Sequence, residues 1–97
     1  MNARVLDQKE KIKQRLSLLL KQESFEEAAA LDDRMVRLGL LSDENLIYAL
    51  AYAHFRVGSF GRAETLLGQI SDPELFRKAV ALRESIEACR ADDWRCE

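Results

Sequence analysis

Few side chains in this chain have the types and spacing that catalysis or metal binding requires. His54 is the only histidine, and it lies in an apolar segment without a carboxylate or cysteine at a spacing that would activate it. Cys89 and Cys96 are seven positions apart, unlike the Cys-x-x-Cys pattern of zinc and redox sites. The sequence has no glycine-rich phosphate loop and no nucleophile elbow. We therefore predict that the protein is not an enzyme and uses no cofactor or metal ion.

A second group of residues is better suited to binding than to catalysis. Its members recur every three or four positions, so they share one side of a helix. Tyrosine and arginine are typical anchors of protein interfaces. The group consists of Asn45, Tyr48, Tyr52, Phe55 and Arg56. We favour a row that binds a partner; the alternative is that the aromatic rings are buried under the first and last helices of a closed bundle.

Composition places the chain among small globular proteins. Its 97 residues form one domain, 1–97, and 47% hydrophobic with 33% charged residues argues against disorder. A formal net charge of −2 provides no strong field that would attract nucleic acid or an anionic membrane. No apolar run approaches the ~20 residues of a membrane span, and there is no signal-peptide pattern. Two cysteines are too few to staple a secreted domain, so we expect free thiols and a cytoplasmic location.

The elements that must position these residues are helices. One proline and four glycines leave little material for β-turns, so we predict an all-α fold of about five antiparallel helices with short connections. Ser42 and Ser71, or the aspartate after each, are suitable N-caps, and Pro73 suits a first helical turn. The segment 45–57 is apolar nearly all round and should lie at the centre of the packing. The helical patterns cover residues 5–20, 25–38, 45–57, 60–70 and 73–92.

An internal repeat organises these helices. The pattern Ser-Phe-x-x-Ala begins at Ser24 and again at Ser59, so its alanines, Ala28 and Ala63, are 35 positions apart. This separation is close to the ~34-residue period of tetratricopeptide repeats, which the stretch 48–63 resembles. A small alanine lets the second helix of a pair approach the first, and Gly58 allows the positive φ that ends the preceding helix. The resemblance implies helical hairpins followed by a C-terminal capping helix.

The resemblance to tetratricopeptide repeats also implies a binding surface. In such arrays the first helix of each pair lines a concave groove that holds a peptide or a helix. The match to the repeat places Asn45, Tyr48, Tyr52, Phe55 and Arg56 on this inner face. An extended peptide would use Asn45 and Arg56 as clamps, whereas a bound helix would use the three aromatic rings as apolar anchors.

A narrower resemblance covers about half of the chain, from Phe25 to Leu67. The segments that carry it are Phe25-Glu26-Glu27-Ala28-Ala29, Arg37-Leu38-Gly39, Asn45-Leu46-Ile47 and Gly58-Ser59-Phe60-Gly61-Arg62-Ala63. In order and spacing they are similar to the needle-subunit chaperones of bacterial type III secretion systems (YscG/PscG-like). The resemblance implies a cytoplasmic chaperone that cradles the amphipathic C-terminal helix of the needle subunit and prevents premature polymerisation. It also implies a hetero-oligomer with a small helical co-chaperone. The alternatives are a generic tetratricopeptide adaptor and a structural subunit that docks through its first helix.

Charge is distributed unevenly along the chain. Residues 1–22 hold six lysines and arginines against two acids, whereas residues 23–47 hold seven acids against Arg34 and Arg37. A basic helix can bind nucleic acid, but aromatic residues are not interleaved here and the next helix is acidic. We therefore predict no nucleic-acid partner and expect a solvated basic face that complements its acidic neighbour.

Overall fold

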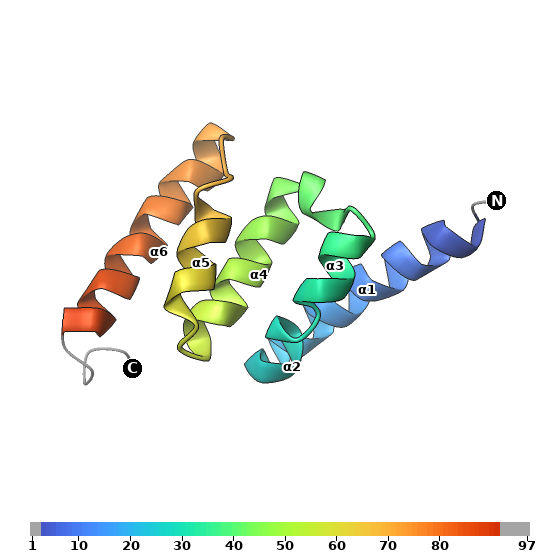
Figure 1. Ribbon diagram of the computed structural model, residues 1–97, viewed down its shortest axis with the longest axis horizontal. Helices are drawn as coiled ribbons and strands as arrows, with labels where there is room; N and C mark the ends of the chain where they lie inside the picture. The colour runs from blue at the N-terminus through green and yellow to red at the C-terminus, as the bar shows by residue number, and fades with distance from the viewer. Residues whose placement is uncertain (1–2, 92–97) are drawn as a thin grey trace.

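The computed structural model describes residues 3–91, with side chains over residues 7–90, and there it consists only of helices and connections (Figure 1). The elements are α1 (Ala3–Lys21), α2 (Phe25–Ala29), α3 (Asp32–Arg37), the 3₁₀ helix η1 (Leu40–Ser42), α4 (Glu44–Arg56), α5 (Phe60–Leu67) and α6 (Pro73–Ala91). The prediction of an all-α fold is confirmed for this part of the chain. None of the described helices combines the length and apolarity that a membrane span needs.

The predicted helix over residues 25–38 is interrupted. A turn at Ala30 and Leu31 separates α2 from α3, although both residues keep right-handed helical dihedral angles. The Leu31 N–H donates to the Ala28 carbonyl, three residues back, which tightens the backbone locally. Neither glycine nor proline stands at this position. The hydrophobic periodicity of the sequence therefore predicts one uninterrupted helix where the structure has two.

Aspartates cap α4 and α6, each of which follows a Ser-Asp pair. Asp43 accepts a hydrogen bond from the Asn45 N–H at 3.0 Å, and Asp72 accepts one from the Leu75 N–H at 3.1 Å. The second of the two capping alternatives is therefore correct in both places. Pro73 begins α6, where its missing N–H leaves no intrahelical bond unmade.

Helix α4 is the centre of the packing, as its composition predicts. Leu50, Ala51 and Ala53 are fully buried, and α4 contacts α1, α2, α5 and α6. In Figure 1, α4, α5 and α6 lie next to one another, and α1 lies against α2 at the other end of the molecule. The outer helices contribute their own apolar stripes, such as Leu16 of α1 and Ile86 of α6, to the same core. The molecule is consequently elongated, with extents of 49 × 28 × 19 Å.

Cys89 departs from its expected state. Its side chain lies on the buried face of α6, and it is disulfide-bonded. The expectation of free thiols is therefore wrong for Cys89. That expectation is based on the small number of cysteines, which does not exclude one disulfide bond. Cys96 lies outside the described residues.

Candidate binding surface

Four aromatic rings form a continuous row across three helices. Phe25 begins α2, Tyr52 and Phe55 lie near the C-terminal end of α4, and Phe60 begins α5. Successive ring centroids are 5.8, 6.2 and 6.0 Å apart, and the first pair meets edge to face. All four rings are half-buried, and those of Tyr52, Phe55 and Phe60 pack against the core with part of their surface. We call these four residues the aromatic row.

Arginines lie over both ends of the aromatic row. The exposed guanidinium of Arg56 lies 4.5 Å from the centre of the Phe25 ring and donates a hydrogen bond to the Tyr52 hydroxyl at 3.0 Å. At the other end, Arg90 lies 6.0 Å from the Phe60 ring and forms an ion pair with Glu64. Cations in these positions are attracted to the faces of the rings. The surface therefore combines apolar rings with exposed hydrogen-bond donors.

The structure divides the predicted group of five residues. Tyr52, Phe55 and Arg56 come together in and beside the aromatic row, as their spacing predicts. Tyr48 is half-buried against the core, and burial raises the pKa of its phenol, with the neighbouring Tyr52 adding to the rise. Asn45 is exposed in the first turn of α4, eleven positions before Arg56, or about 16 Å along the helix.

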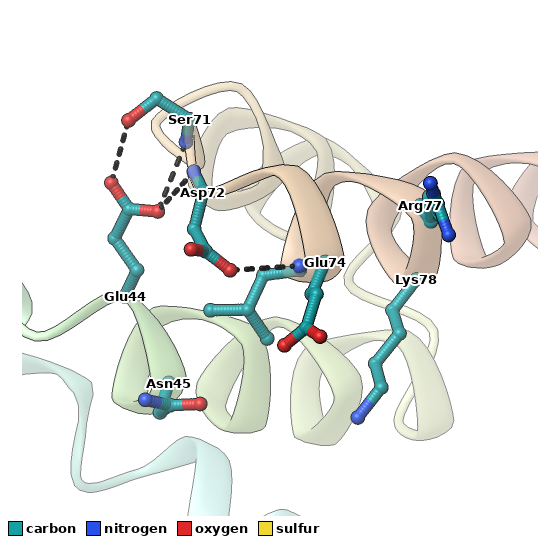
Figure 2. Close-up of a pocket in the computed structure, with 8 residues that line it drawn as sticks. Glu44, Asn45, Ser71, Asp72, Glu74, Arg77 and Lys78 are labelled. Atoms are coloured by element: carbon teal, nitrogen blue, oxygen red, sulfur yellow. Dashed lines mark hydrogen bonds between the residues drawn. The ribbon is translucent and has the colours of Figure 1, made fainter.

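Asn45 instead lines a polar cleft between the start of α4 and the start of α6 (Figure 2). The Glu44 carboxylate dominates this cleft by accepting hydrogen bonds from the Ser71 N–H, the Ser71 hydroxyl and the Asp72 N–H at 2.8–3.0 Å. The hydrogen bond from Asp72, followed by those from Ser71, holds the pKa of Glu44 below its usual value. These three hydrogen bonds to Glu44 fix the connection between α5 and α6 against the start of α4.

A repeated turn sets the direction of Phe25 and Phe60. Ser24 and Ser59, which precede them, have the same backbone angles, with φ −86° and ψ 66° or 67°. In both turns the serine N–H donates to the carbonyl five residues back, at 2.8 Å. The residue before each serine has a positive φ, 60° at Glu23 and 86° at Gly58. The repeat seen in the sequence is therefore also a repeat of backbone geometry.

The small residues of the repeat have the environment that their size predicts. Ala28 and Ala63 are completely buried, in α2 and α5 respectively. Helix α2 contacts both α1 and α4, and α5 contacts α4 and α6. A larger side chain at either alanine would push these helices apart. The close packing of α2 and of α5 against their neighbours therefore fixes the positions of Phe25 and Phe60, the two outer rings of the aromatic row.

A polar cluster that the sequence did not predict joins α3, α4 and α5. Asp32 of α3 accepts two hydrogen bonds from the Arg62 guanidinium of α5, at 2.7 and 2.8 Å. The His54 Nε2 of α4 lies 2.7 Å from the same carboxylate. Arg62 is the main cause that lowers the pKa of Asp32, with His54 contributing in the same direction. The partners are 22 and 30 positions apart, so no local pattern in the sequence connects them.

The cluster connects α3, α4 and α5 through side-chain hydrogen bonds. The His54 ring contacts Asp32 through Nε2, and its Nδ1 is buried without a hydrogen-bond partner among the described residues. Within the described residues, the side-chain hydrogen bonds of the cluster connect Asp32, His54 and Arg62 to one another. Within residues 7–90, no three side chains are placed to hold a metal ion.

Comparison with known proteins adds no relative to this description: no family model, curated protein or solved structure matches the chain.

Proposed function

We propose that this chain is a tetratricopeptide-like protein that binds a segment of another polypeptide and catalyses no reaction. The observation that supports the proposal is the aromatic row with Arg56 at its end. Half-buried rings beside an exposed guanidinium are the kind of surface that interface hot spots use. Because three helices hold the rings in place, little conformational entropy would be lost when a partner binds.

The order of contacts supports tetratricopeptide-like hairpins. Helix α1 contacts α2, and α4 contacts α5, so each long helix has a shorter partner that follows it in the chain. The long helices α1 and α6 also contact α4, which is the relation between the first helices of successive repeats. The repeated turn at Ser24 and Ser59 agrees with this arrangement. In it, α6 is the capping helix.

The placement of the side chains favours a helical occupant over an extended peptide. Clamping an extended peptide would rely on Asn45 and Arg56, but Asn45 lies in the polar cleft near Glu44. Tyr52 and Phe55 instead lie together beside the rings of α2 and α5. An amphipathic helix can place apolar side chains on such a row while Arg56 meets one of its polar groups.

The most specific form of the proposal is the needle-subunit chaperone. A subunit that polymerises exposes apolar helix surface, and a protein that covers this surface keeps the subunit monomeric. The proposal includes a small helical co-chaperone and a cytoplasmic location. The disulfide at Cys89 is the observation that stands against that location, because structural disulfides are rare in the reducing cytosol.

The experiment is a pull-down with the tagged chain from its native cells, in parallel with two variants. Arg56→Ala removes the cation beside the aromatic row, and Lys78→Ala removes an exposed cation from α6 as a control. We expect the native chain and the control to retain a small helical protein that polymerises once released, and Arg56→Ala to retain at least fivefold less, since hot-spot truncations cost more than about 1 kcal/mol.

A large unrelated assembly retained equally by all three proteins would contradict the chaperone and favour a structural subunit. The double variant Tyr48→Ala with Phe55→Ala is a weaker test, because both side chains also pack against the core. A loss of binding by this variant would support the proposal only if its thermal unfolding curve matched that of the native chain.

A further inference from the structure

A basic groove lies between α1 and α3 and shares no residue with the aromatic row. It has a volume of about 650 Å³, and no carboxylate is among the described side chains that line it. Four cations border it, two from each helix, together with two aliphatic side chains and the amide of Gln8. The cations and aliphatic residues are Lys11, Ile12, Arg15, Arg34, Arg37 and Leu38. We call this set the basic groove.

The cations of the basic groove are largely unpaired. Arg15 approaches Glu27 at 4.0 Å, but both side chains are more than half exposed, so this contact neutralises little charge. Lys11, Arg34 and Arg37 form no ion pair within the part of the chain that the structure describes. The expected complement between a basic first helix and an acidic neighbour is therefore limited here to one long contact. Like charges from two helices meet instead.

The floor of the groove is apolar. Ile12 is 7% exposed and Leu38 is half-buried, and both belong to or pack against the core. An aliphatic floor bordered by positive charge is complementary to a segment with aliphatic residues on one side and carboxylates beside them. We propose that the basic groove binds an acidic, amphipathic segment of a partner polypeptide. Its aliphatic side chains rest on Ile12 and Leu38, and its carboxylates meet the four cations.

The same features make nucleic acid a poorer occupant. Proteins that bind single strands combine positive charge with aromatic rings on which bases stack, and none of the described residues that line this groove is aromatic. The proposal is independent of the function proposed for the aromatic row, because the two surfaces share no residue.

The test uses a fluorescently labelled helical peptide with leucines on one face and glutamates on its flanks. Anisotropy is measured with the full chain at low salt and again at high salt, where exposed charge pairs are screened. We expect saturable binding that weakens with salt. The same peptide with lysines in place of the glutamates, and a labelled oligothymidylate, should not bind.

Matched variants locate the binding. Arg34→Gln with Arg37→Gln removes two exposed cations from the basic groove, and Arg77→Gln with Lys78→Gln removes two from α6. The first pair should weaken peptide binding about tenfold and the second less than twofold, since only the first charges meet the peptide. Arg56→Ala should leave this affinity unchanged, which separates this proposal from that for the aromatic row. Failure of the native chain to bind the glutamate peptide, equal weakening by both pairs, or tighter binding of the oligothymidylate would each overturn the proposal.

Discussion

Asp32 shows how one carboxylate can organise three helices. Its side chain is 15% exposed, and both of its oxygens accept hydrogen bonds from the Arg62 guanidinium while one also meets His54. A planar guanidinium and a carboxylate match in geometry, so both bonds form without strain. A buried negative charge is tolerated here because its partners come from α4 and α5. Removing one partner would leave the other charge inadequately solvated.

Replacing Asp32 by asparagine should therefore destabilise the protein more than its small change in shape suggests. We expect a loss of about 2–3 kcal/mol, in the range of charge-assisted hydrogen bonds. The matched control is Glu64→Gln, which removes a more exposed partner of Arg90 and should cost at most about 0.5 kcal/mol. Urea unfolding followed by circular dichroism measures both values. An Asp32→Asn midpoint equal to that of the native chain would show that the Asp32 charge contributes nothing to stability.

The same carboxylate predicts a dependence of stability on pH. The Arg62 and His54 contacts lower the pKa of Asp32 in the folded protein below the ordinary value of 3.8. The folded state therefore holds the ionised form, and its contribution is complete above the unfolded pKa. As the pH falls from about 4 through the folded pKa, this stabilisation should disappear.

Unfolding free energies of the native chain and of Asp32→Asn, measured from pH 6 to pH 2, test this prediction. Their difference should shrink across the acid range, because protonation removes the charge that the substitution removes at neutral pH. Glu44 has a lowered pKa as well, but it is present in both proteins and its effect cancels in the difference. A constant difference at all pH values would contradict the prediction.

At the scale of elements, the two copies of the serine turn both need a positive φ before the serine but place different residues at that position. Gly58 has a φ of 86° and no atom within 4 Å of the place where a Cβ would stand. The equivalent Glu23 has a φ of 60°, which costs a residue with a Cβ about 1 kcal/mol or more. The first turn therefore carries backbone strain that the second avoids.

Exchanging residue types between the turns should shift stability in opposite directions. Gly58→Ala should destabilise the protein by about 1 kcal/mol, and Glu23→Gly should stabilise it by a smaller amount, because glycine also loses more chain entropy on folding. Gly61→Ala is the control: it lies in α5, has no positive φ and has open space around it, so it should stabilise by about 0.5–1 kcal/mol. Thermal midpoints report all three. Gly58 and Gly61 variants that shift in the same direction would show that the positive φ has no energetic consequence.

At the scale of the molecule, the sequence predicts those structural features that are determined by residues close together in the chain. Periodicity and capping residues predict the helices, and a short pattern that recurs 35 positions later predicts the repeated turn. The break between α2 and α3 cannot be predicted from the sequence, because no glycine or proline stands there. The contact of Asp32 with His54 and Arg62, and the distance of Asn45 from the aromatic row, depend on packing between helices. One-sided spacing along α4 places five residues on a face, but it cannot say which other elements meet that face.

The role of α1 distinguishes two interpretations of the whole molecule. In one, α1 is part of the hydrophobic core; in the other, it is a docking element attached to a core that folds without it. Its stripe of Ile12, Leu16 and Leu19 is 1–7% exposed. Burying three such side chains contributes roughly 5–9 kcal/mol, which is comparable to the ~5–15 kcal/mol stability of a small domain. The basic groove lies beside this stripe, so α1 serves the core and the surface together.

Removing residues 1–22 should therefore abolish folding instead of leaving a shorter folded protein. We expect loss of the cooperative thermal transition and binding of a hydrophobic dye, because the residues beneath α1 become exposed to water. Two point variants make the test finer. Leu16→Ala, at a fully buried position, should cost about 2–5 kcal/mol, whereas Leu18→Ala, at a position 54% exposed, should cost at most about 0.5 kcal/mol. A truncated chain that still unfolds cooperatively near the native midpoint would instead make α1 a docking element, and the basic groove would then need α3 alone to hold its partner.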